Sequence, residues 1–182
     1  FIYSHDSIFL GEDGPTHQSV EHHWALRIIP NLDYFRPADG VEVAMTWAYA
    51  LKSQKTPIAF SLTRQGVPRI EREADFNPED VWRGGYGIRN ATDPHVILVG
   101  TGSELHLCTE AAQALSEDGY RVRVVSMPST DVFVAQDAAY RDRVLPPDVR
   151  ARVAVEAAHP DYWYRFVGLD GAVVGIDRFG MS

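Results

Sequence analysis

Cysteine and long apolar runs are both scarce in this sequence. Its 182 residues contain one cysteine, Cys108, which excludes an internal disulfide framework and fits a reducing compartment. No apolar run approaches the ~20 residues of a membrane span, and there is no basic start followed by a small-residue cleavage site, as in a signal peptide. We therefore expect a cytoplasmic protein without a membrane partner.

Positive charge is scarce as well. The chain has 17 lysines and arginines against 25 aspartates and glutamates, which gives a net charge of −8. Such a surface repels phosphate polymers, so we expect no nucleic-acid partner, and any anion site must be a local pocket. The chain begins at Phe1, inside a β-prone run, and ends just after another such run. We therefore expect a piece of a longer polypeptide.

Short β-prone runs alternate with amphipathic stretches along most of the chain, which predicts βαβ units and mostly parallel sheets. A charge-rich, apolar-poor segment over residues 70–83 is expected to be a linker between residues 1–69 and 84–182. The expected fold class is α/β, with two successive three-layer α/β units. Strands are expected at residues 1–3 (buried), 32–35, 58–62, 96–100, 121–127, 152–156 and 172–176, and helices near 20–29, 40–52, 105–119 and 162–167.

Two helix starts carry recognisable caps. Ser19 is the expected N-cap of the first helix. Asp39 with Glu42 resembles a capping box that opens a helix ending near Lys52. The apolar spacing predicts that the following residues of this second helix are buried: Val43, Thr46, Trp47, Ala50 and Leu51.

The densest set of polar side chains lies in residues 4–18, with two histidines, three carboxylates, two glycines and one proline. The glycines and the proline can set a fixed backbone path that aims His5, Asp13 and His17. Arg64 follows the expected strand 58–62, and ligands of open α/β sheets bind beyond the carboxyl ends of strands. A guanidinium fits a phosphate monoester, imidazoles add donors, and Asp13 can accept hydrogen bonds from sugar hydroxyls.

Alternatives remain for this loop. Arg64 can instead pair with a loop carboxylate while the histidines satisfy backbone groups. A metal site built from His5, Glu12, Asp13 and His17 has competent ligand types, but the spacing matches no compact zinc pattern, so no metal ligand is assigned. His22 and His23 are adjacent on the expected helix and point in different directions, which favours a solvated or capping role.

Three other motifs favour a structural interpretation. Gly100-Thr101-Gly102-Ser103 follows a strand but lacks the third glycine of a dinucleotide turn, so a helix start capped by Thr101 or Ser103 is expected. Cys108 lies on an apolar helical stripe and is expected to be inert core. The aromatic run at 162–166 is expected to pack in the core or at a subunit interface.

Taken in order, these motifs resemble those of the transketolase family. Residues 4–18 match a loop that reads His-Asp-Ser-Ile, two variable positions, then Gly-Glu-Asp-Gly-Pro-Thr-His-Gln. Phe9 stands at one variable position where the family usually has glycine, and its ring is expected to narrow the substrate channel. Further matches, typical of the bacterial branch, follow in the expected order at 36–40, 63–65, 84–86, 101–104, 124–131, 161–164 and 175–180.

The resemblance implies the second half of a pyrimidine-binding domain over residues 1–69 and a transketolase C-terminal domain, incomplete at its C-terminus, over residues 84–182. Transketolases are transferases of the pentose phosphate pathway that move a two-carbon ketol unit from a ketose phosphate to an aldose phosphate. They use thiamine diphosphate and a divalent cation, Mg²⁺ or Ca²⁺, and the resemblance implies a homodimer.

By analogy with the family, His5 and Arg64 would bind the substrate phosphate. Asp13 would read the hydroxyl next to the aldehyde carbon. His17 would lie near the reacting carbons as the catalytic residue of this set. We therefore expect a transketolase piece that supplies the substrate-phosphate and hydroxyl-binding side of the site. The alternative is a non-catalytic α/β module that binds a sugar phosphate or a protein partner.

The family's diphosphate-and-metal motif, its activating glutamate and its cofactor-stacking aromatic residues are absent from these 182 residues, so no cofactor-binding residue is assigned here. We therefore expect the isolated chain to show no ketol transfer and to bind thiamine diphosphate weakly. A coupled ketol-transfer assay and calorimetry with the purified chain measure both properties, with the longer polypeptide as the positive control. Measurable turnover by the isolated chain would refute this expectation.

Overall fold

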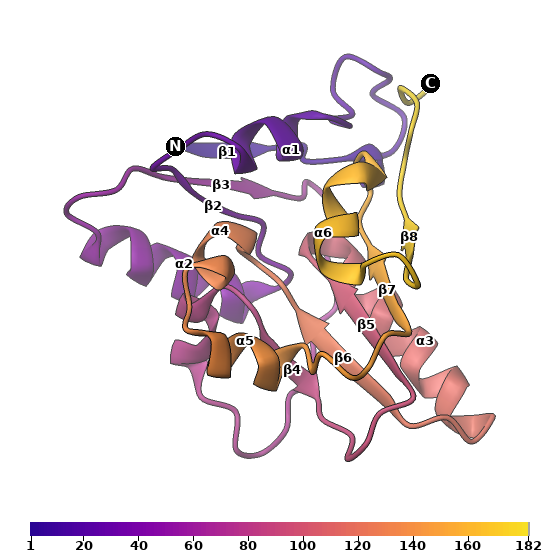
Figure 1. The fold of residues 1–182 in the computed structure, drawn as a ribbon. Coiled ribbons are helices and arrows are strands. Elements are labelled where there is room, and N and C mark those ends of the chain that lie inside the picture. The colour runs from indigo at the N-terminus through magenta and orange to yellow at the C-terminus, as the bar shows by residue number, and fades with distance from the viewer. Residues whose placement is uncertain (182) are drawn as a thin grey trace.

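Two sheets of mostly parallel strands organise residues 1–181, which the computed structural model describes (Figure 1). The first sheet has the order β1-β3-β2, and all of its strands are parallel. The second has the order β4-β6-β5-β7-β8, and only β4 runs antiparallel to its neighbour. The strands are β1 (Ile2–Ser4), β2 (Asp33–Phe35), β3 (Ile58–Leu62), β4 (Tyr86–Arg89), β5 (Val96–Gly100), β6 (Val122–Ser126), β7 (Arg152–Val155) and β8 (Ala172–Val174).

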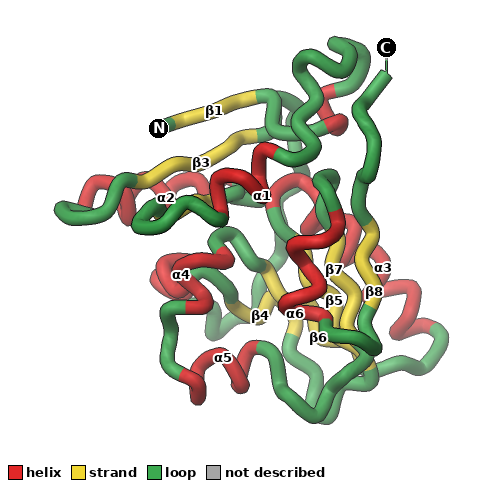
Figure 2. The backbone as a smooth tube through the Cα atoms, turned by 45° about the horizontal axis from the view of Figure 1, so that its top comes forward, coloured by secondary structure: helices red, strands yellow, loops and turns green. Residues whose placement is uncertain are grey.

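The expected α/β class with mostly parallel sheets is thereby confirmed. In the first sheet, neighbouring residues of β2 face opposite sides: Tyr34 packs toward Leu26 of α1 (His22–Arg27), and Phe35 packs toward Tyr49 of α2 (Gly40–Lys52). The second sheet is covered by α3 (Leu105–Glu117) on one face. Its other face is covered by α4 (Thr130–Val134), α5 (Ala138–Val144) and α6 (Tyr164–Val167) (Figure 2).

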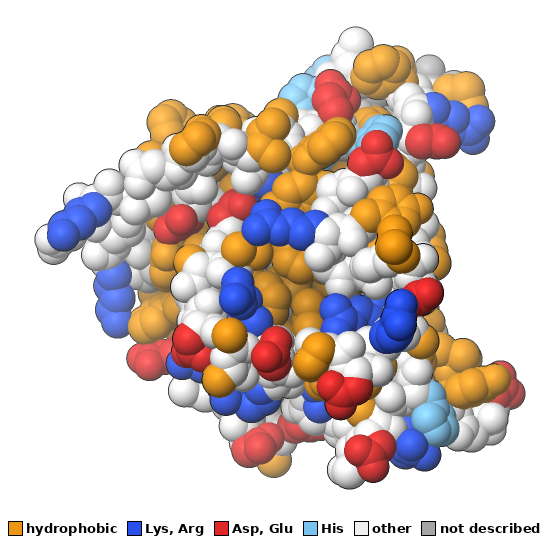
Figure 3. Space-filling model, in the orientation of Figure 1, with side chains coloured by type: hydrophobic (Ala, Val, Ile, Leu, Met, Phe, Trp, Pro, Cys, Tyr) orange, Lys and Arg blue, Asp and Glu red, His pale blue; other side chains and the backbone are white. Residues whose placement is uncertain are grey.

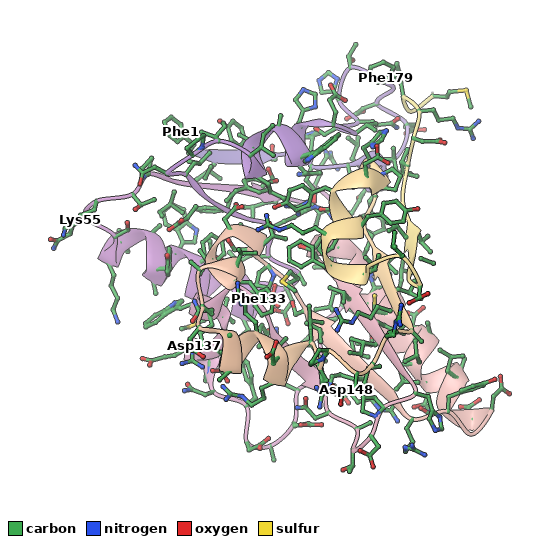
Figure 4. All side chains as sticks on the ribbon, in the orientation of Figure 1. Phe1, Lys55, Phe133, Asp137, Asp148 and Phe179 are labelled. Atoms are coloured by element: carbon green, nitrogen blue, oxygen red, sulfur yellow. The ribbon has the colours of Figure 1, made fainter. Side chains whose placement is uncertain are left out.

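Short 3-10 helices connect these elements, at Ile8–Leu10, Pro78–Arg83, Gly102–Glu104 and Pro160–Trp163. Phe133 of α4 lies in the apolar core between the second sheet and its helices (Figure 4). The aromatic run packs there too, with Trp163 fully buried, as the sequence predicts, although Tyr164 is half exposed. Among the helices of residues 1–181, none is long and apolar enough to cross a membrane.

The two predicted helix starts have different outcomes. The Asp39 carboxylate accepts the backbone N–H groups of Val41 and Glu42, both at 3.1 Å, and caps α2 as expected. The prediction for Ser19 is wrong, because α1 is only six residues long and begins after Glu21, without a side-chain cap. The backbone carbonyl of Val20 instead accepts a hydrogen bond from His159, which holds this segment against the second unit.

Two burial predictions are also wrong. Of the residues predicted to be buried on α2, Thr46 is buried and Val43 and Ala50 are partly buried, but Trp47 and Leu51 are 43% and 80% exposed. The buried face of the helix includes Glu42 instead, which contacts the second unit. The strand β1 is not buried either. It is an edge strand, and Phe1 is 74% exposed. Figure 3 shows hydrophobic side chains on the surface at the end of the molecule that carries β1.

A buried arginine joins the two units. Arg36, which directly follows β2, is fully buried, and its guanidinium donates to the carboxylates of Asp6 (2.8 Å) and Glu104. A carboxylate oxygen of Glu156 lies 3.4 Å from the same guanidinium. Glu156 also forms a bidentate ion pair with the buried Arg27, with distances of 2.7 and 2.8 Å. Desolvated carboxylates are tolerated only when they are paired and hydrogen-bonded, so these charges fix the two units together.

The turn at residues 100–104 provides further hydrogen-bond acceptors for Arg36. Arg36 donates to the Ser103 hydroxyl and the Thr101 carbonyl, both at 3.3 Å. Gly102 has a φ of +56°, and a Cβ there would lie 2.7 Å from the guanidinium, so glycine allows the close approach. A helix does begin here, but neither predicted cap forms: Thr101 makes no side-chain capping bond, and the Ser103 hydroxyl donates to the Glu104 carboxylate at 2.5 Å instead.

A second buried cluster reinforces the contact between the units. The Glu42 carboxylate accepts hydrogen bonds from the Tyr86 hydroxyl (2.8 Å) of β4 and the Ser126 hydroxyl (2.5 Å) of β6. Arg72, from the segment 70–83, donates to Asp39 at 2.8 and 3.0 Å and to Tyr86. Burial raises the pKa of the Glu42 carboxyl, and the Ser126 hydroxyl opposes that shift.

We expect the substitution Arg36→Leu to lower the free energy of unfolding by about 3–5 kcal/mol, because it leaves buried carboxylates without their cation. Denaturant unfolding measures this loss. The matched control is Arg150→Leu, which breaks an exposed pair with Asp170 and should cost no more than about 1 kcal/mol. Equal losses for the two variants would contradict the role assigned to Arg36.

Candidate functional site

Three of the four residues predicted for the site meet in the loop that follows β1. His5 comes directly after that strand, and its Nε2 lies 4.0 Å from a carboxylate oxygen of Asp13. The imidazole rings of His5 and His17 are 6.0 Å apart, edge to face. The turn between them uses a glycine with positive φ at Gly14. The loop thus gathers two imidazoles and one carboxylate at the carboxyl end of a parallel strand.

Each histidine has a hydroxyl partner from the preceding residue. His5 Nδ1 lies 2.9 Å from the Ser4 hydroxyl, and His17 Nδ1 lies 2.9 Å from the Thr16 hydroxyl. The alternative in which both histidines satisfy backbone groups does not describe these rings. The sequence analysis did not predict these partners, although a hydroxyl residue directly precedes each histidine in the sequence.

A cavity of about 250 Å³ opens beside the two imidazoles. Phe179, from the segment after β8, also lines it, which the sequence analysis did not foresee. Figure 4 places Phe179 beside the loop, far along the chain from it. The lining residues are Ser4, His5, Pro15, Thr16, His17, Gln18, Ser19, His22 and Phe179.

Arg64 lies at the same edge of the first sheet. It follows β3 by two residues, and Leu62 at the end of β3 pairs with Ser4 at the end of β1. Its side chain is exposed, does not line the cavity, and forms no ion pair within residues 1–181. The alternative in which Arg64 pairs with a loop carboxylate therefore does not describe this structure. The guanidinium is left available to an anionic ligand.

The loop is anchored by two amides. Gln65 donates to the carbonyl of Leu10 at 2.5 Å, and Gln18 donates to the carbonyl of Gly11. Gly180 packs closely against the Gln18 side chain, so the C-terminal segment covers this part of the loop. Phe9 does not line the cavity. Its ring lies 6.2 Å from that of His106 in α3, so the expected narrowing of a substrate channel by Phe9 finds no support here.

The prediction of a solvated or capping role is wrong for His23. It is neither solvated nor a cap, being 1% exposed, with Nδ1 2.5 Å from the Tyr34 hydroxyl and Nε2 2.6 Å from the carbonyl of Asp6. Burial lowers the pKa of His23 to about 4, and the positive charge of Arg36 acts in the same direction. The ring is therefore neutral at physiological pH. His22, its neighbour, is exposed, as expected.

The part of the chain that the structure describes holds no candidate metal site. Within residues 1–181, no three histidine, cysteine, aspartate or glutamate side chains are placed to hold a metal ion. Cys108 is buried and free, and burial raises the pKa of its thiol to about 12, so it is an inert core residue as predicted.

The fold and the loop define an α/β protein of two parallel-sheet units with a polar site at the carboxyl end of the first sheet. A family model described as the transketolase pyrimidine-binding domain matches residues 1–69, and one described as the transketolase-like C-terminal domain matches residues 84–182. The chain belongs to the transketolase family.

Individual relatives agree with this assignment. A probable transketolase from Streptococcus pneumoniae is 52% identical over 183 residues, which cover 100% of this chain and 27% of that protein. The structure of transketolase from Leishmania mexicana has a TM-score of 0.91 at 43% identity and covers 100% of this chain and 26% of that one. A Pichia stipitis transketolase in complex with sedoheptulose 7-phosphate has a TM-score of 0.90 at 37% identity, covering 98% and 25%. The chain thus spans about a quarter of these relatives' length.

We expect the free energy of unfolding to decrease as the pH is lowered, because of His23. The unfolded state binds a proton near pH 6.5, but the folded state binds it only near pH 4, so between these values protonation favours unfolding. The loss reaches up to about 3 kcal/mol. Burial raises the pKa of Asp131 to about 6, which has the opposite effect on stability over this range. A comparison with the variant His23→Gln cancels this contribution, because both proteins contain Asp131.

Denaturant unfolding from pH 7.5 to 4 is the measurement. The stability of the unsubstituted protein relative to His23→Gln should be highest above pH 6.5 and decline toward pH 4. A difference that does not change with pH would contradict the buried neutral state of His23.

Proposed function

We propose that this chain is the part of a transketolase that binds the phosphate and hydroxyl groups of its sugar-phosphate substrates. The observation that carries the proposal is the cluster of His5, Asp13 and His17 at a strand edge shared with Arg64, in a chain similar over its whole length to proteins named transketolase. The full enzyme transfers a two-carbon ketol unit between a ketose phosphate and an aldose phosphate in the pentose phosphate pathway.

Arg64 and His5 bind the substrate phosphate in this proposal. A guanidinium offers a planar fork of donors that matches two phosphate oxygens, and Arg64 is exposed and unpaired within residues 1–181. His5 Nε2 lies 4.0 Å from the Asp13 carboxylate, too far for a hydrogen bond, and can donate to a third oxygen. The complex of a Pichia stipitis relative with sedoheptulose 7-phosphate supports a phosphorylated sugar as the ligand.

Asp13 and His17 act on the sugar itself. The Asp13 carboxylate is half exposed, 4.0 Å from His5 Nε2, and can accept hydrogen bonds from hydroxyls, which discriminates between epimers. The ring of His17 is exposed, and its Nε2 can hydrogen-bond to an oxygen of the reacting carbons, where charge develops in the transition state. His17 is thus the catalytic residue of this set.

The proposal also includes the domain boundaries of this chain and the cofactors of the full enzyme. We divide the chain into the second half of a pyrimidine-binding domain (1–69), a linker (70–83) and a C-terminal domain (84–182). Thiamine diphosphate and a divalent cation, Mg²⁺ or Ca²⁺, are bound by other parts of a cytoplasmic homodimer in this proposal, because the family's diphosphate-and-metal motif is not among these 182 residues. The transketolase relatives favour this function over a non-catalytic binding module.

We expect Arg64→Ala in the full-length enzyme to raise KM for phosphorylated substrates. The loss of a charge-assisted contact costs about 1.5–3 kcal/mol, which is roughly 10- to 150-fold. Steady-state kinetics with phosphorylated and unphosphorylated donors measures the effect, and Arg69→Ala, another exposed arginine, is the control. Equal losses with both classes of donor would rule out a phosphate-binding role for Arg64.

A further inference from the structure

His23 and Tyr34 form a buried pair close to His5, since His23 and His5 line the same cavity, but neither residue lines the cavity beside His17. His23 is on α1 and Tyr34 on β2, and both side chains are buried, at 1% and 0% exposure. Buried polar groups cost free energy unless they are hydrogen-bonded, so an apolar pair would fill this space at less cost. The polar pair calls for another explanation.

The hydrogen bonds of His23 determine its tautomer. The carbonyl oxygen of Asp6 can only accept, so His23 Nε2, 2.6 Å away, carries the hydrogen and donates it. Nδ1 is then an acceptor, and the Tyr34 hydroxyl, 2.5 Å away, donates to it. Tyr34 therefore keeps the donating nitrogen of His23 on the side of Asp6.

Asp6 is consequently held at both of its ends. Its main-chain carbonyl accepts from His23, and its carboxylate accepts from Arg36 at 2.8 Å. The residue before it, His5, has a left-handed backbone with φ +60°, a conformation that needs support from its surroundings. With Asp6 held in place, the backbone of His5 is held as well.

Besides the Ser4 hydroxyl, 2.9 Å from Nδ1, and the Asp13 carboxylate, 4.0 Å from Nε2, which both belong to the same chain segment, the side chain of His5 has little to hold it. A second cavity of about 330 Å³ lies on the α1 side of His5, and both His5 and His23 line it. The first cavity, which His5 also lines, opens beside His17. A ring that borders two cavities and is 33% exposed has few packing contacts, so its direction depends on the backbone.

We propose that His23 and Tyr34 are positioning residues, which aim His5 at the substrate phosphate by holding the Asp6 carbonyl. This inference rests on the proposed function of His5. It assigns a role in substrate affinity to two buried residues that touch no substrate.

The test uses four variants of the full-length enzyme. His23→Leu removes the donor to Asp6, and Tyr34→Phe removes the group that sets the tautomer. His23→Gln keeps an N–H that can reach the Asp6 carbonyl. The control is Tyr140→Phe, which removes a buried tyrosine hydroxyl that donates to the Gly85 carbonyl at 2.8 Å in the second unit.

For His23→Leu we expect KM for a phosphorylated donor to rise roughly tenfold, the equivalent of one lost hydrogen bond, with kcat and the kinetics of an unphosphorylated donor little changed. Tyr34→Phe should shift KM in the same direction, and His23→Gln should restore most of it. Tyr140→Phe should lose stability without a change in KM. If His23→Leu fails to fold, Tyr34→Phe and His23→Gln carry the same comparison.

The inference is overturned if the His23 and Tyr34 variants change KM no more than Tyr140→Phe, or if both donors are affected equally. Crystal structures of the variants give a second readout that needs no activity. A rotated Asp6 carbonyl and a His5 that leaves its left-handed conformation support the inference, and an unchanged His5 overturns it. If the unsubstituted enzyme shows no ketol transfer, the proposed function fails, while these structures still decide the positioning role.

Discussion

The structure depends on one buried guanidinium. Arg36 lies at the end of β2 and meets carboxylates from the loop after β1, from the start of α3 and from the end of β7: Asp6, Glu104 and Glu156. A single buried carboxylate without a cation would shift its pKa and become neutral rather than stay charged. Arg27 and Arg36 together offset the burial of Glu156 and hold the pKa of its carboxyl well below its usual range. Three separate chain segments are therefore fixed to one point.

That point also sets the geometry of the candidate site. Asp6 belongs both to the charge cluster and to the loop, so the loop begins from a fixed residue rather than from a flexible one. The loop is then held by amides from Gln18 and Gln65. His5 and His17 are left with a single hydroxyl partner each, and their outer nitrogens are available. Rigid support below exposed functional groups is the arrangement that binding sites require, because it reduces the entropy lost when a ligand binds.

Features that depend on contacts between residues close in the sequence were predicted correctly, whereas features that depend on contacts between distant residues were not. The helix α2 was predicted with its cap, because Asp39 contacts N–H groups only two and three residues away. The buried face of the same helix was predicted only in part: Trp47 and Leu51 are exposed, while Glu42 is buried by partners from β4 and β6, more than forty residues away. The antiparallel strand β4 was missed because its pairing with β6 is a long-range contact. His23 was assigned to solvent because its partner Tyr34 lies on another element.

The sequence by itself determined the α/β class, the position of the polar loop with His5, Asp13 and His17, and the likeness to the transketolase family, because all of these are carried by local patterns and motifs. Only the tertiary structure decided which charges are buried, which face of α2 is covered and how His5 is held. The reason is physical: the free energy of a charged or polar side chain depends on the groups around it, and in Arg36, Glu42 and His23 those groups come from distant segments of the chain.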